Sequence, residues 1–171
     1  MNEESRRRIA SELKRVEEDC TYSSKSHFNA ADRLRRTHNW VGGFAVVLSA
    51  AGGTAILAES VPAIAGTTSL IVAVLAALLT FMKFSERSVE HKSAGDQFLA
   101  LKSDVRRYRE VRLVELEDVS VAMTATDEFA ERQQALNRSA PITDEGDFKK
   151  ARRGIEEGEA VHVVDVKGDE K

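Results

Sequence analysis

The sequence predicts an all-α membrane protein, a two-transmembrane antiparallel helical hairpin extended by long cytoplasmic helices that pack as a coiled-coil-like bundle. Two apolar segments without a charged residue, 40–58 and 61–82, follow each other in the middle of the chain. Apolar residues recur at spacings of three and four on both sides of them, as in helices that bury one face. Only 2 prolines occur in 171 residues, which leaves room for long unbroken helices.

Residues 3–39 are charged but periodic, and they predict a cytoplasmic helix. They contain neither Gly nor Pro, so nothing breaks this helix before the first apolar segment. One face follows the spacing of a heptad seam. The seam residues are Leu13, Val16, Cys20, His27 and Leu34. Within the seam, His27 is either a polar layer that sets helix register, which we favour, or a pH switch, or half of a metal site with Cys20.

Residues 40–58 and 61–82 are each long enough to cross a bilayer. Helices of these lengths span roughly 28 to 33 Å, against a hydrocarbon core of about 30 Å. The connection between them is so short that the two helices must run antiparallel. A buried hairpin in a soluble bundle is the alternative, but the chain has few other apolar residues with which to cover both helices. We therefore expect a lipid bilayer as the partner of this region.

Small residues recur every fourth position in both predicted spans. They let helix backbones approach closely, since packing drives helix association within a membrane. The helix-packing or pore-lining candidates are Ala45, Ser49, Gly53, Ala65, Ser69, Ala73 and Ala77. Ser49 and Ser69 lie at nearly equal depth, so their hydroxyls can meet across the hairpin. Either stripe can instead face a neighbouring subunit or line a pore, and packing is the interpretation that we favour.

Basic residues flank both spans on the same side. Three arginines lie within 33–36, and Lys83, Arg87 and Lys92 follow the second span, whereas Glu59 is the only charge in the loop. Because basic residues are retained in the cytoplasm, both termini are predicted to be cytoplasmic. The expected interface anchors are Trp40, Phe81 and Phe84. Glu59 is then either a charge at the outer mouth of an oligomeric pore or a solvated loop charge.

Residues 83–138 are predicted to continue the second span as a cytoplasmic helix that packs antiparallel to the helix at 3–39. Its seam residues are Phe98, Leu101, Val105 and Tyr108. Beyond Tyr108 the apolar face shifts, so we expect a drift of the seam or a change of packing partner there. The two-span domain is thus expected at residues 1–138. Residues 139–171 contain few large apolar residues and are predicted to be a disordered acidic tail.

The sequence contains no recognisable catalytic constellation. It lacks a phosphate-cradling Gly loop, a nucleophile elbow and paired Cys or His at ligand spacing, so we expect neither an enzyme nor a cofactor. A net charge of −3 gives no nucleic-acid signature. The absence of ionisable residues from both predicted spans argues against proton pumps, voltage sensors and ion-coupled transporters. A passive pore formed by a homo-oligomer remains compatible with the sequence.

The order of these features resembles the SLATT domain, a family named for two-transmembrane effectors associated with nucleotide-second-messenger synthases and nucleotide-sensing modules. A basic helix with His27, Ala30 and Ala31 precedes two Gly- and Ala-rich spans. The exit from the second span carries Phe81, Met82, Lys83, Glu86, His91, Ala94, Phe98 and Leu101. The resemblance covers residues 9–116 and rests on this architecture.

The resemblance implies an effector of the bacterial inner membrane that oligomerises and forms or gates a pore in a nucleotide-signalled anti-phage defence system. The chain carries no recognisable nucleotide-binding sensor. A partner nucleotide synthase or nucleotide-sensing protein would therefore supply the signal. The alternative function is a non-conducting membrane anchor or scaffold whose cytoplasmic helices dock partner proteins.

Overall fold

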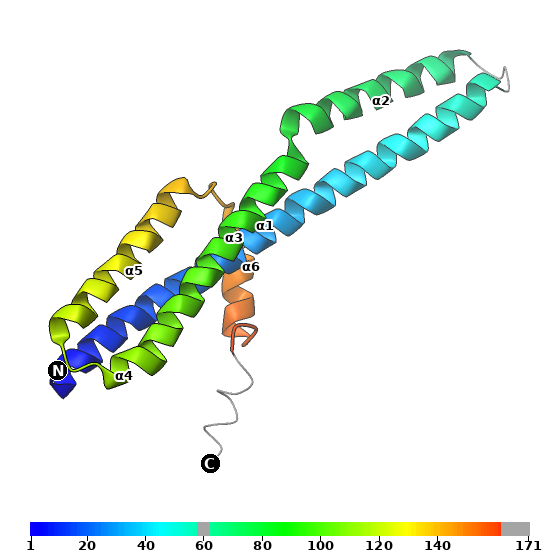
Figure 1. The fold of residues 1–171 in the computed structure, drawn as a ribbon. Helices are drawn as coiled ribbons and strands as arrows, with labels where there is room; N and C mark the ends of the chain where they lie inside the picture. Colours follow the sequence, from blue (N-terminus) through cyan, green and yellow to red (C-terminus); the bar gives the residue numbers. More distant parts are fainter. Residues whose placement is uncertain (58–61, 162–171) are drawn as a thin grey trace. The chain divides into compact units, whose positions relative to one another are not determined.

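The structure is a computed structural model that describes residues 1–57 and 62–161, with the side chains of all of these except 55–57 and 62–65. In chain order, the elements are α1 (Glu3–Leu57), α2 (Pro62–Met82), α3 (Phe84–Arg107), a π-helix η1 (Tyr108–Arg112), α4 (Leu113–Glu115), α5 (Val119–Ser139) and α6 (Glu145–Glu156) (Figure 1). Every regular element in these two stretches is helical, which confirms the all-α prediction.

The chain divides into two compact units. One consists of Met1–Ala30 and Glu90–Lys171, and we call it the core unit; the other is Ala31–Val89, and we call it the apolar unit. Both unit boundaries fall inside helices, so α1 and α3 each contribute to both units. The predicted spans fall in the apolar unit, and the predicted cytoplasmic seams fall in the core unit, apart from Leu34.

α1 is one helix of 55 residues, so the predicted cytoplasmic helix at 3–39 runs without a break into the first predicted span. Asn2 caps its first turn, because Asn2 Oδ1 accepts a hydrogen bond from the Ser5 backbone N–H at 2.7 Å. The acidic residues Glu3 and Glu4 lie at the positive end of the helix dipole. No proline occurs along α1, which lets the helix continue where the sequence changes from polar to apolar.

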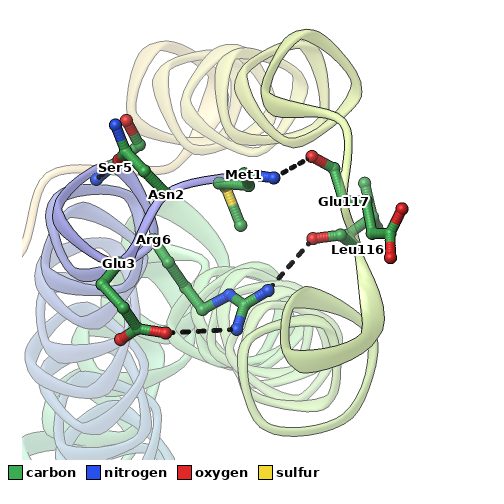
Figure 2. A network of polar contacts seen from close by, with 7 residues as sticks. All are labelled: Met1, Asn2, Glu3, Ser5, Arg6, Leu116 and Glu117. Atoms are coloured by element: carbon green, nitrogen blue, oxygen red, sulfur yellow. Dashed lines mark hydrogen bonds and ion pairs between the residues drawn. The ribbon is translucent and has the colours of Figure 1, made fainter.

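The start of α1 is hydrogen-bonded to the turn between α4 and α5, as Figure 2 shows. The Met1 amino group donates a hydrogen bond to the Glu117 carbonyl, and Arg6 Nη2 donates one to the Leu116 carbonyl at 3.3 Å. Glu3 lies 3.7 Å from the Arg6 guanidinium. These contacts join the first residues of the chain to a segment that lies 110 to 116 residues later in the sequence.

α1 and α3 run antiparallel in the core unit. Glu17 pairs with Arg109 at 2.9 Å, and further along α1 the His27 ring meets His91, which lies earlier on α3. The buried side chains of these helices, of the segment after α3 and of α5 form one cluster: Ile9, Leu13, Val16, Cys20, Phe98, Leu101, Val105, Tyr108, Leu113 and Ala122. The two helices therefore meet along the faces that the three-four spacing predicts.

The prediction of one helix over 83–138 is wrong because the chain is interrupted three times. Lys83 separates α2 from α3 and has a φ of 49°, a conformation that residues other than glycine rarely adopt. The π-helix η1 widens one turn at the point where the apolar face of the sequence shifts. After α4, Leu116 is extended with a ψ of 124°, and the chain reverses direction before α5.

α5 begins at a capping residue and packs on η1, the π-helix that follows α3. Asp118 Oδ1 accepts hydrogen bonds from the hydroxyl and the backbone N–H of Ser120, each at 2.8 Å, and these bonds lower the pKa of Asp118. The Phe129 ring lies edge-on to Tyr108 with 5.5 Å between the ring centroids. The apolar periodicity of the sequence does not predict this reversal, because the capping residue Asp118 determines where α5 starts.

Part of the tail at 139–171 that we predicted to be disordered forms the helix α6. This 12-residue helix starts at Asp144, which caps it by accepting a hydrogen bond from the Gly146 N–H at 3.0 Å. Residues 162–171 of the predicted tail lie outside the described residues. The prediction of disorder is therefore wrong for the segment that forms α6.

α6 packs on α1, and the residues that it buries are small or polar, which explains why its sequence looked disordered. Ala151 and Gly154 are buried. The Phe148 ring lies 6.1 Å from the Tyr22 ring between centroids, and Asn29 Nδ2 donates to the Asp147 carbonyl at 3.1 Å. A prediction that counts large apolar residues misses such a helix, because the residues that it buries are small or polar.

Candidate membrane-spanning region

The second predicted span has the properties of a membrane helix. Among the residues that the structure describes, one helix is long and apolar enough to cross a membrane by length and composition. It lies within the helical stretch Gly66–Glu115, which begins in α2 and ends with α4, and its most apolar window has a mean hydropathy of 1.9 with none of its residues buried. The first predicted span, 40–58, ends outside the residues whose side chains are described. These features indicate association with a membrane.

α1 and α2 lie antiparallel in the apolar unit, and two glycines define where they touch. A Cβ added to Gly42 would lie 4.0 Å from Leu79 Cδ1, whereas a Cβ added to Gly52 would lie only 3.0 Å from Thr68 Cγ2. The residue number falls on α2 as it rises on α1, which sets the antiparallel direction. Gly52 is the tighter contact, since any side chain there requires Thr68 to move.

The contact face of the two helices follows a three-four spacing. On α1, Ala45 and Leu48 are half-buried and Gly52 is buried; on α2, the half-buried residues are Thr68, Val72, Leu75 and Leu79. Apart from Leu48, the residues of this face on α1 are small, and they receive larger residues on α2. Sequence reasoning missed Gly42, Gly52 and the α2 residues of this face, although their heptad spacing was readable in the sequence.

The predicted small stripe lies mostly outside this contact face. Ala45 belongs to the face, but Ser49, Gly53, Ser69, Ala73 and Ala77 are exposed, and the side chain of Ala65 lies outside the described residues. Ser49 and Ser69 each follow a residue of the contact face by one position, and Ser49 Oγ donates to the Ala45 carbonyl at 2.8 Å. One position turns a side chain by about 100° around a helix, which points the stripe outward.

Large apolar side chains cover the outer surface of this unit. The exposed ones are Trp40, Phe44, Val46, Val47, Leu70, Ile71, Val74, Leu78, Phe81 and Val89. Leaving one such side chain in water instead of burying it costs roughly 1.5–3 kcal/mol, so this surface requires an apolar environment. Of the predicted interface anchors, Trp40 and Phe81 are 79% and 84% exposed, whereas Phe84 is half-buried. Glu59, the predicted outer-mouth charge, lies outside the described residues.

A comparison with known protein families matches residues 9–166 to SMODS and SLOG-associating 2TM effector domain family 4. The chain belongs to this family. The match confirms the resemblance to the SLATT domain that the sequence predicted, and it identifies a two-transmembrane effector domain. No curated protein and no solved structure matches the chain. Because the match includes α5 and α6, the SLATT domain extends past residue 138, where we predicted its end.

The seam that we predicted to be cytoplasmic is buried throughout in this SLATT domain. The buried seam residues of the core unit are Leu13, Val16, Cys20, His27, Phe98, Leu101, Val105 and Tyr108, and Leu34 is buried in the apolar unit. His27 Nδ1 lies 3.0 Å from His91 Nδ1, and the His27 ring stacks on Phe98 with 5.6 Å between centroids. His91 was missed as the partner of His27, although it precedes Phe98 by one heptad.

The His27–His91 pair is a polar layer inside the seam. Since the two Nδ1 atoms share one hydrogen bond, one of them donates and the other must be unprotonated. Burial, and then the neighbouring His91, lower the pKa of His27, so its ring is neutral at pH 7. A charged pair at this distance would be strongly repulsive.

The surroundings of Cys20 in this SLATT domain do not activate its thiol as a nucleophile or a metal ligand. Burial, and then Asp19, raise the pKa of the Cys20 thiol to about 12, so the thiol stays protonated. No group of three or more His, Cys, Asp or Glu in the described part of the chain is arranged to hold a metal ion. The metal-site interpretation of Cys20 with His27 therefore has no support in the described geometry.

Proposed function

We propose that the protein is a two-span effector of the bacterial inner membrane that oligomerises and forms or gates a pore in a nucleotide-signalled anti-phage defence system. Its membership of a 2TM effector family carries this proposal. The two spans are residues 40–58 and 61–82, paired as an antiparallel hairpin, and both termini lie in the cytoplasm. No catalytic residue or cofactor is part of the proposed mechanism.

The outward small stripe supports the step of oligomerisation. Ser49, Gly53, Ser69, Ala73 and Ala77 point away from the helix pair of their own chain, so they are available to the hairpin of another copy. Small residues let such helices approach closely in lipid. Once copies surround a pore, the stripe residues either pack between subunits or line the lumen, and Glu59 lies at its outer mouth.

The core unit is where we place the response to a signal. The family is described as associating with SMODS and SLOG modules. A partner nucleotide synthase or nucleotide-sensing protein would act on the helices of the core unit. α1 is one helix from the core unit into the first span, so a displacement of α1 in the cytoplasm reaches the membrane without an intervening loop.

Dye release from liposomes tests pore formation. The full-length protein is reconstituted at increasing density into vesicles that contain self-quenched carboxyfluorescein. An oligomeric pore predicts release that rises more steeply than linearly with protein density. In cells, co-expression with a nucleotide synthase or sensor encoded beside it should collapse the membrane potential. An intact potential and retained dye, despite verified insertion, would contradict the proposal.

Substitutions in α2 test the role of the stripe. Ser69→Leu places bulk on the stripe, and Val74→Leu places the same leucine side chain at an exposed position outside it. We expect Ser69→Leu to reduce the oligomer size in detergent and the dye release, because the larger side chain separates neighbouring backbones. Val74→Leu should change neither. Equal oligomer sizes for the two variants would remove the stripe from the mechanism.

A non-conducting scaffold is the second candidate, and a groove on the core unit favours it. The groove has a volume of about 500 Å³ and lies between α1, α5 and α6. Its lining includes Glu18, Tyr22, Gln133 and Phe148, which offer both hydrogen-bonding and aromatic contacts to a docked protein. A scaffold releases no dye at any protein density, so the liposome experiment separates the two functions.

A further inference from the structure

Basic side chains of the apolar unit gather at one level of the helix pair. Ser88 Oγ donates a hydrogen bond to the Ala31 carbonyl at 2.8 Å, and Gly42 faces Leu79 further along. The segments between these two contacts therefore run beside each other. They carry five basic residues, which are Arg33, Arg35, Arg36, Lys83 and Arg87. We call this set the basic collar.

The acidic residues at the same level neutralise the basic collar only in part. Asp32 lies 2.8 Å from Arg35 and 3.8 Å from Arg36, so two guanidinium groups share one carboxylate. Glu86 pairs with Lys83 at 2.8 Å. Asp32 and Glu86 are the only acidic residues between the two contacts. The collar thus keeps a positive excess, and the Arg35 and Arg36 side chains are largely exposed to solvent.

The basic collar borders the apolar outer surface directly. Trp40 follows Arg36 by four residues on α1, and Phe81 precedes Lys83 by two. Four residues of helix correspond to about 6 Å along its axis. Exposed aromatic rings of this kind lie at the level of lipid headgroups. When the rings occupy that level, the guanidinium groups of the collar reach the phosphate layer.

We propose that the basic collar binds anionic phospholipid headgroups and enriches these lipids around the protein. The guanidinium of arginine presents a planar fork of donors that matches phosphate oxygens, and Arg35 and Arg36 present two such forks side by side. A zwitterionic lipid offers the same phosphate without a net negative charge, so it gains less from the collar's positive excess. This inference rests on the proposed membrane insertion of the apolar unit.

The chain contains one tryptophan, Trp40, which makes it a built-in probe of the lipid beside the collar. The full-length protein is reconstituted into vesicles of phosphatidylcholine with phosphatidylglycerol, in which one or the other lipid carries bromine on its acyl chains. Bromine quenches tryptophan fluorescence only at close range. The ratio of quenching by the two brominated lipids at equal mole fraction gives the relative binding constant at this site.

We expect the relative binding constant to favour phosphatidylglycerol by about fivefold, the factor that one well-placed basic side chain contributes near a membrane. The preference should weaken as salt increases. The double substitution Arg35→Gln and Arg36→Gln should lower the constant toward one. The matched control, Arg106→Gln with Arg107→Gln, removes the same charge from two exposed residues of the core unit and should leave the preference unchanged.

Each outcome is decisive. A relative constant near one for the unaltered protein overturns the collar proposal, and so does a preference that survives the loss of Arg35 and Arg36. If neither brominated lipid quenches Trp40, the apolar unit is not inserted, and the proposed function fails instead. In vesicles of brominated phosphatidylcholine alone, equal Trp40 quenching in all variants shows that the substitutions leave insertion intact.

Discussion

α1 packs against another helix in both units, but the two contacts are built from different residues. In the core unit it meets α3 through large side chains such as Leu13, Phe98 and Val105, which are almost completely buried. In the apolar unit it meets α2 through Gly42, Ala45 and Gly52, while large apolar side chains point outward. Removing apolar area from water stabilises the first contact. In lipid, the second contact would be stabilised by the close approach of the two helix backbones.

The largest effect is expected from truncating the core of the core unit. Phe98→Ala removes a ring that is 1% exposed and stacks on His27, which should destabilise the protein by about 3 to 5 kcal/mol. Leu70→Ala truncates an exposed side chain of the apolar unit and should cost less than about 0.5 kcal/mol in detergent. Chemical unfolding followed by circular dichroism measures both. Equal losses would show that the two units do not differ in this way.

The close approach in the apolar unit is tested at its glycines. Gly52→Val should weaken the α1–α2 contact by about 1 to 3 kcal/mol, because its Cβ alone would lie 3.0 Å from Thr68 Cγ2. Gly43→Val is the matched control, since nothing lies within 4 Å of a Cβ at that position. Cysteines introduced at Ala45 and Leu75, in a Cys20→Ser background, report the contact by cross-linking yield. A yield that falls equally in both variants would contradict the assigned face.

The two units should also differ in their response to pH. The pKa of His27 is lowered in the folded protein, so below the ordinary value of 6.5 the unfolded chain binds a proton that the folded chain does not. Stability of the core unit should therefore fall as pH drops below 6.5, by at most about 1.4 kcal/mol per pH unit for this group.

The matched variant for the pH experiment is His27→Gln, which should flatten this dependence in unfolding curves recorded between pH 7.5 and 5. The spans should add no pH dependence of their own, because residues 40–57 and 62–82 contain no ionisable side chain. A slope that is unchanged in His27→Gln would mean that another group causes it.

The smallest effect concerns the break between α2 and α3. Lys83→Gly should stabilise the protein by about 1 kcal/mol, because glycine adopts a φ of 49° without the steric cost that a side chain incurs. Ser85→Gly, within α3, should instead cost roughly 0.5–1 kcal/mol as an ordinary helix position. Thermal unfolding midpoints compare the two. A loss of stability in both variants would indicate that the break at Lys83 straightens in solution.

Much of the fold could be predicted from periodicity, because helices that bury one face repeat their apolar residues regularly. The bounds 3–39 and 61–82 agree with the start of α1 and with the extent of α2 to within one residue. The seam from Leu13 to Tyr108 was readable in the same way. α6 was not, since the residues that it buries include Ala151 and Gly154, which look like the residues of a flexible tail.

The sequence by itself determined that this chain forms long helices, which of them are apolar enough for lipid, and which family it belongs to. Only the tertiary structure decided that Gly42 and Gly52 face α2 while Ser49 and Ser69 face outward, and that His27 lies against His91. The physical reason is that a helix apolar on every side has no polar face to show which side is packed. Packing against the partner helix then decides which side is buried.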